Sequence, residues 1–181
     1  MQVKASASAA AAVVEEAAQR VTEMLARGAA LRDVLAKLAS AAESIAGGGS
    51  VASILLLDRD GLLRNGASPN LPADYLDAID RIRPDPQLGT CAAAAATGQV
   101  VFTPDFREDR KWAELKHLPL AIGFRGAWSM PIKDAAGRVL GTLGTYYRDT
   151  RLPRPDELDA VARLVALAAQ ALAARGVAAA G

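Results

Sequence analysis

The sequence has 181 residues, which suffices for one domain with helical extensions and for a core that needs no disulfide or metal. Its 21 Lys and Arg residues nearly balance its 20 Asp and Glu residues, and the charges are scattered, so no basic surface for a nucleic acid or an anionic membrane is expected. The single cysteine excludes an internal disulfide and a zinc site built from several thiolates, and it suits a reducing compartment.

Residues 1–12 lack the basic start and long apolar stretch of a secretory signal, and we expect them to be disordered or a linker. The alanine-rich stretch 164–174 is too short to span a hydrocarbon core, which needs about 20 residues. These features predict a cytoplasmic protein without a membrane partner.

Two helices are predicted over residues 13–46. In the first, apolar residues recur at helical spacing from Val13 to Leu25, before Gly28 ends the pattern. In the second, apolar residues follow the i, i+3, i+4, i+7 pattern from Leu31 to Ile45, and three glycines at 47–49 stop it.

Short segments follow. Residues 50–57 and 62–66 flank the turn sequence 58–61 and predict a β-hairpin. Residues 75–82 predict a short amphipathic helix, because Tyr75, Leu76, Ile79 and Ile82 fall on one face.

Residues 90–97 predict an alanine-rich helix that Gly98 terminates, and residues 99–103 predict a strand. The segment 105–123 carries many charges and indicates a loop with a short helix, and loops of this kind often carry function.

A second hairpin and a long helix complete the pattern. Residues 124–132 and 139–147 predict two strands, and Gly141 and Gly144 inside the second indicate either close backbone approach or a bulge. An apolar stripe over residues 155–175 predicts a helix whose second apolar face meets another subunit. The element order describes an α+β fold around an antiparallel sheet of five or six strands.

Several motifs from Leu88 onward occur in a fixed order. The most specific is Trp128-Ser129-Met130-Pro131-Ile132 followed by Gly137-Arg138-Val139-Leu140-Gly141-Thr142. The others are Gly89-Thr90-Cys91, Ala95, Gly98, Asp105, Asp109, Trp112, Gly123 to Ala127, Tyr146, Tyr147, Arg151 and Pro153.

This ordered set resembles the GAF family of bacterial sensor domains. The resemblance implies a single GAF domain over residues 13–175, followed by a tail at 176–181. It also implies that the helices 13–46 and 155–175 cover one sheet face, where such helices commonly form a dimer seam. A ligand pocket, roofed by short helices and loops, is implied on the other face.

Ligands within the GAF family include cyclic nucleotides, haem, bilins, small anions and metabolites, so the resemblance leaves the ligand and any cofactor unknown. The Asn-Lys-x-Phe-Asp-Glu motif of cyclic-nucleotide-binding GAF domains is absent. The Cys-His pair that anchors bilins in phytochrome-like domains is also absent, because Ala92 follows Cys91.

Aromatic residues make up only 4% of the chain, and most fall on or beside the segments that the resemblance places around the pocket. Large apolar walls with few polar groups are typical of a small-molecule site, whereas core packing is an equally good explanation for any single ring. The aromatic candidates are Phe102, Phe106, Trp112, Phe124, Trp128 and Tyr146.

Three further residues are candidates for ligand binding. Cys91 is either a thiol made redox-sensitive by a helix N-terminus or a small buried side chain. His117 is either an axial haem ligand, as in some mycobacterial-type GAF sensors, or a surface residue. Ser129 offers a hydroxyl on the Trp128 strand.

The carboxylates of the segment 105–109 are balanced by Arg107, Arg110 and Lys111, and they predict a solvated charged loop with no metal site. The sequence has one histidine and no Gly-x-Ser-x-Gly motif, so it lacks the residues with which a serine hydrolase builds its catalytic site. The GAF enzymes that reduce free methionine sulfoxide resemble this fold but use several cysteines. We therefore expect no enzyme activity.

The sequence predicts a sensory domain that binds an unidentified small molecule and transmits its occupancy through the terminal helices. We expect a homodimer through these helices and a fused or separate output domain. Two alternatives remain, a dimerisation module without a ligand and a haem sensor that uses His117.

Overall fold

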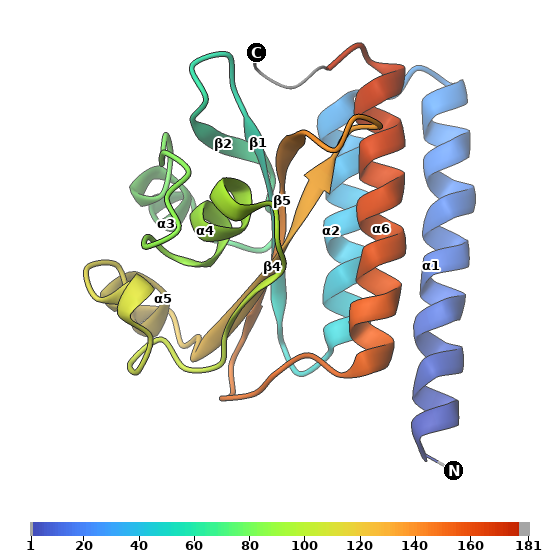
Figure 1. Ribbon diagram of the computed structural model, residues 1–181. Helices are drawn as coiled ribbons and strands as arrows, with labels where there is room; N and C mark the ends of the chain where they lie inside the picture. Colours follow the sequence, from blue (N-terminus) through green and yellow to red (C-terminus); the bar gives the residue numbers. More distant parts are fainter. Residues whose placement is uncertain (1, 178–181) are drawn as a thin grey trace.

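The computed structural model describes residues 2–177, with side chains from residue 7 onward. Within this part of the chain, a five-stranded antiparallel sheet separates two layers of helices (Figure 1). The strands lie in the order β2-β1-β5-β4-β3. They are β1 (Val51–Leu57), β2 (Leu63–Ala67), β3 (Val101–Thr103), β4 (Gly126–Lys133) and β5 (Val139–Tyr147). The predicted α+β fold is confirmed.

Three long helices lie on one side of the sheet, two packed against it and the first helix of the chain packed against the outer side of those two (Figure 1). They are α1 (Gln2–Ala26), α2 (Leu31–Ala46) and α6 (Pro155–Ala174). Their apolar positions are buried as the helical periodicity predicts, with Leu38 of α2 and Leu164 of α6 fully enclosed. None of the helices among the described residues is both long and apolar enough to cross a bilayer.

Helix α1 begins at Gln2, so it includes most of the segment 1–12 that was expected to be disordered or a linker. Alanine has the highest helix propensity, and Ala10 and Val14 add buried contacts in the helical layer. The division into linker, domain and tail stays a prediction, and residues 178–181 of the expected tail lie outside the described residues.

The wide apolar stripe of α6 is covered within the same chain. Helix α6 packs against α2 and β4 on one side and against α1 on the other. Arg163 of α6 also donates a hydrogen bond to Glu15 of α1. The second apolar face, which suggested another subunit, is therefore accounted for by α1.

Short elements form the layer on the opposite sheet face, here called the roof (Figure 1). They are α3 (Ala73–Ala78), α4 (Thr90–Thr97), the 3-10 helix η1 (Arg110–Trp112) and α5 (His117–Ala121). Helix α3 ends earlier than the predicted residue 82. The reason is that the following chain pairs with β2, where Leu63 exchanges backbone hydrogen bonds with Ile82 and Arg81.

Two glycines of β5 allow close packing, as predicted. A Cβ on Gly141 would overlap the carbonyl oxygen of Leu55 in β1, and one on Gly144 would lie 2.8 Å from the Cys91 sulfur. The Gly144 position thus allows α4 to approach the sheet closely.

Candidate ligand site

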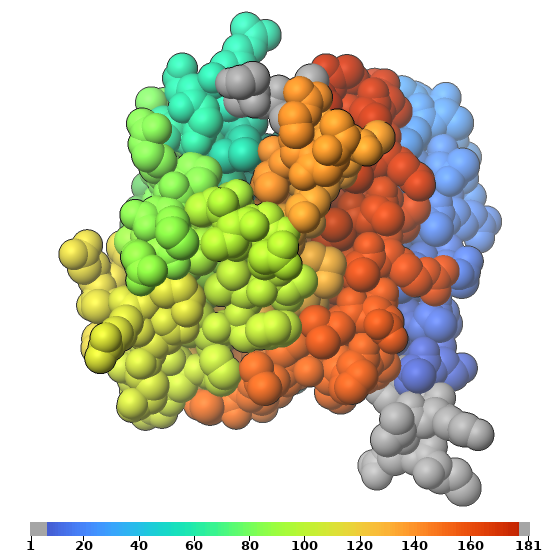
Figure 2. Space-filling model, in the orientation of Figure 1, coloured from blue at the N-terminus to red at the C-terminus, as the bar shows by residue number. Residues whose placement is uncertain are grey.

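A cavity of about 30 Å³ lies between the sheet and the roof. Its sheet side is formed by Leu55, Leu63 and Tyr146, from β1, β2 and β5. The roof contributes mainly the first turn of α4, together with Trp112 and Leu115. The segments of the roof, green to yellow in Figure 2, lie against one another on this side of the molecule.

Aromatic rings pack in a cluster beside this cavity. The Tyr146 ring lies 5.7 Å from Phe124, 6.4 Å from Phe106 and 5.9 Å from Tyr75, measured between ring centroids. Phe106 also meets Trp112 at 4.5 Å. The structure therefore brings together four of the six aromatic candidates, and it adds Tyr75.

A chain of hydrogen bonds fixes the indole of Trp112, which forms one cavity wall. The Trp112 Nε1–H donates to Thr90 Oγ1 at 2.8 Å, and the Thr90 hydroxyl donates to Thr103 at 3.1 Å. Thr103 in turn donates to Asp109 at 2.8 Å, and Lys111 pairs with the same carboxylate at 2.7 Å. Every donor in the chain has an acceptor, so the indole is held in one orientation.

The environment of Asp109 corrects the prediction that the segment 105–109 is a solvated charged loop. Burial by itself raises the pKa of Asp109, but hydrogen bonds from Lys111 and Thr103 outweigh burial and lower the pKa overall. The carboxylate also accepts the backbone N–H of Lys111 and so caps η1. By contrast, Asp105 pairs with Arg107, whose hydrogen bonds hold the Asp105 pKa at about 2.

Cys91 and Ser129 lie between α4 and the sheet, on the cavity side. Burial raises the pKa of the Cys91 thiol, and the nearby hydroxyls of Ser129 and Thr142 offset part of this effect. The thiol therefore stays protonated, and Cys91 is half-buried, which fits a small packed side chain better than a redox-sensitive thiolate. Ser129 is fully buried, and its hydroxyl also makes a long contact of 3.4 Å with the Leu143 carbonyl.

Of the nine predicted site residues, only Cys91, Trp112 and Tyr146 line the cavity, and three others lie away from it. Trp128 faces the long helices and belongs to the core beneath α2 and α6, because successive strand residues point to opposite faces. Phe102 stacks on Trp128 at 6.3 Å and is 38% exposed. His117 is exposed at the start of α5.

The sequence did not select Tyr75 as a site residue, although its place on the apolar face of the predicted helix was visible. Tyr75 is only 3% exposed, and its hydroxyl has no hydrogen-bond partner among the described residues. A buried hydroxyl without a partner is uncommon and costs free energy.

A polar junction lies on the helix side of β5. The Tyr147 hydroxyl donates to Glu157 of α6, which is fully buried and also binds Arg151 Nη1 at 3.1 Å. Arg151 stacks 3.5 Å above the Tyr147 ring and donates to the Ala46 carbonyl at the end of α2. The junction thus joins β5, α2 and α6. Sequence analysis missed Glu157, because an acidic residue in a first helical turn is ordinarily exposed.

The GAF domain family model matches residues 28–173, which is most of the chain. The chain belongs to the GAF domain family. The matched region contains the whole sheet, the roof and most of the helical layer.

The GAF domain is 36% identical over 141 residues to a methyl sulfide methyltransferase-associated sensor of Methanosarcina acetivorans. That match covers 77% of this chain but spans only 14% of the relative's length.

Two solved structures share the fold. The free methionine-R-sulfoxide reductase of Neisseria meningitidis, in complex with its substrate, has a TM-score of 0.73 at 18% identity and covers 95% of this chain and 93% of its own. A domain of a putative two-component sensor histidine kinase from Sinorhizobium meliloti has a TM-score of 0.65 at 22% identity, with coverage of 82% and 99%.

Proposed function

We propose that this GAF domain is a cytoplasmic sensory module that binds a small molecule beneath its roof and acts without catalysis of its own. The observation that carries the proposal is the cavity between sheet and roof, with its oriented Trp112 wall. Similarity to a sensor and to a sensor kinase domain supports a regulatory role. By the same comparison, we propose that the terminal helices connect to an output domain.

The size of the cavity indicates a closed state. A space of about 30 Å³ admits about two water molecules, whereas ligand sites ordinarily measure about 300–1,000 Å³. A metabolite therefore requires the roof to move away from the sheet. The roof suits such a movement because its helices are short and joined by turns.

Strand β5 offers the route to the helices. Tyr146 faces the cavity, and the next residue, Tyr147, faces the junction with Glu157 and Arg151. A guest that displaces Tyr146 shifts the backbone that also carries Tyr147. The junction then passes this shift to the ends of α2 and α6, a two-state bias of the kind that a sensor requires.

The proposal is tested by the unfolding temperature of the domain with a panel of defined metabolites. A ligand at 100 times its Kd stabilises by about 2.7 kcal/mol, which raises the unfolding temperature of a domain of this size by about 5–11 °C. The variant Leu115→Ala enlarges the cavity and serves as a second, more permissive receptor. A panel in which no compound stabilises either protein would refute ligand sensing.

A dimerisation module without a ligand is the second candidate, and the small cavity favours it. It predicts a dimer by sedimentation velocity at micromolar concentration, with no metabolite effect on stability. A homodimer through the terminal helices is itself a proposal, and the same measurement tests it. A monomer in this measurement would contradict both the dimerisation module and the proposed homodimer through the terminal helices.

The residues present do not fit haem. His117 is exposed at the start of α5 and does not line the cavity, so it is not placed to bind an iron there. Catalysis of the sulfoxide-reductase type also lacks support, because the one cysteine is a protonated, half-buried thiol that lies against Gly144.

A further inference from the structure

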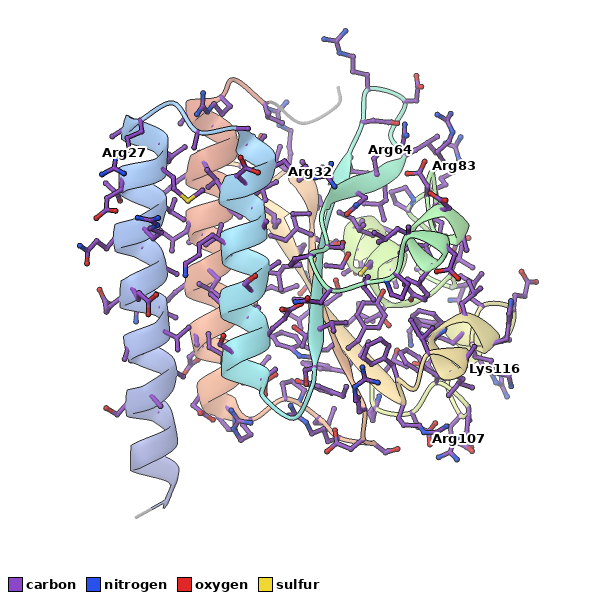
Figure 3. All side chains as sticks on the ribbon, turned by 180° about the vertical axis from the view of Figure 1, so that it is seen from behind. Arg27, Arg32, Arg64, Arg83, Arg107 and Lys116 are labelled. Carbon is purple, nitrogen blue, oxygen red and sulfur yellow. The ribbon has the colours of Figure 1, made fainter. Side chains whose placement is uncertain are left out.

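The cavity offers no charge to a guest. None of its lining residues is acidic, basic or histidine. The basic residues of the roof include Arg83 and Arg107, which are exposed and point outward (Figure 3). A charged guest would lose its hydration without gaining an ion pair, at a cost of several kcal/mol.

Two buried hydroxyls on the cavity side of the sheet, those of Tyr75 and Thr142, lack a hydrogen-bond partner among the described residues, and neither residue belongs to the cavity lining. The Tyr75 ring meets Tyr146 edge-on, and the Tyr75 hydroxyl is buried. The side chains of Tyr146 and Cys91, which both line the cavity, lie close enough to influence the pKa of Tyr75. The Tyr146 hydroxyl nevertheless does not complete a hydrogen bond to it.

The protonation state of these tyrosines makes them hydrogen-bond donors. Burial raises the pKa of Tyr75 and of Tyr146 well above that of a free tyrosine, so both hydroxyls keep their protons at neutral pH. A neutral tyrosine hydroxyl donates one hydrogen bond. Because the cavity offers no counter-charge, an acceptor on an uncharged molecule satisfies this hydroxyl at the lowest desolvation cost.

We infer that the guest of this cavity is an uncharged molecule with a carbonyl or ether oxygen. The Tyr75 hydroxyl, beside the Tyr146 ring of the lining, donates a hydrogen bond to this oxygen once the guest displaces that ring. The apolar part of the guest packs against Trp112 and Tyr146. This inference rests on the proposed function and names the ligand class for the same site. It sets anions, zwitterions and nucleotides aside, because each would bury an unpaired charge.

Three probes of similar shape test the inference through tryptophan fluorescence excited at 295 nm. Cyclohexanone carries the acceptor, methylenecyclohexane replaces its oxygen with a CH₂ group, and cyclohexanecarboxylate adds a charge. The proteins are the wild type, Leu115→Ala for additional room, and Tyr75→Phe, which removes the donor but keeps the ring. Tyr147→Phe is the matched control, since it removes a buried hydroxyl on the opposite face of β5.

We expect cyclohexanone to bind the wild type or Leu115→Ala about five- to tenfold more tightly than methylenecyclohexane, the effect of one hydrogen bond. Tyr75→Phe should abolish this preference, and Tyr147→Phe should keep it. If only the Leu115→Ala protein binds the probes, both substitutions are made in that background. The inference fails if Tyr75→Phe retains the preference, or if the carboxylate binds as tightly as the ketone. Ligand sensing would survive either result. Absence of binding by all three probes to both the wild type and Leu115→Ala overturns the inference, whereas the proposed function is refuted only by a metabolite panel without a stabilising compound.

Discussion

The junction at Glu157 gives the sharpest prediction for stability. In Glu157→Gln the carboxylate loses its charge while the side chain keeps its size. The Tyr147 hydroxyl and the guanidiniums of Arg151 and Arg154, which lie at 3.1 and 3.6 Å, then face an uncharged amide.

The magnitude follows from the burial of the partners. Breaking a buried ion pair costs about 3–5 kcal/mol when the remaining charge is enclosed. The side chains of Arg151 and Arg154 are 22% and 42% exposed, so water partly replaces the ion pairs that they lose with Glu157. We therefore expect the lower end, about 3 kcal/mol, which lowers the unfolding temperature by about 6–12 °C for a domain of this size.

Calorimetry and urea unfolding at pH 7 measure this effect. The control is Glu15→Gln, whose pair with Arg163 is exposed on both sides and should contribute less than about 1 kcal/mol. Tyr147→Phe should cost about 1 kcal/mol, and the double variant should cost less than the sum of the two single variants. A Glu157→Gln protein as stable as the Glu15→Gln control would refute this account of the junction.

Three other substitutions have distinct expected outcomes. Tyr75→Phe should leave the unfolding temperature unchanged or raise it, because it removes a buried hydroxyl without a partner; a loss of stability comparable to that of Tyr147→Phe would show that Tyr75 is satisfied. Asp109→Asn should cost about 1–2 kcal/mol at pH 7. Because the folded-state pKa of Asp109 is lowered, this difference should be complete above about pH 4 and shrink as the pH falls further, as urea unfolding at pH 3 and 7 can measure. Gly141→Ala should cost at least about 2–3 kcal/mol or prevent folding, because its methyl group overlaps the Leu55 carbonyl; soluble protein with wild-type urea unfolding would contradict this packing.

Four of the predicted site residues lie together in the structure, and ligand binding by them stays a prediction. Phe106, Trp112, Phe124 and Tyr146 cluster beside the cavity, because the motifs that carry the family resemblance lie on the segments that form it. Trp128 and Phe102 lie on the other sheet face. A strand pattern that is apolar on both faces does not reveal which residues face which layer, and an error of one residue reverses every assignment.

The sequence by itself determined the helices α2 and α6, both hairpins and the two close-packed glycines of β5. Each of these depends on local periodicity or backbone freedom, which a short window of residues contains. Only the tertiary structure decided which face each strand residue takes, which residues satisfy Trp112, and that Glu157 is buried against Tyr147 while the Tyr75 hydroxyl is left without a partner. These depend on groups that are distant in sequence and meet only after the sheet, the roof and the long helices have packed together.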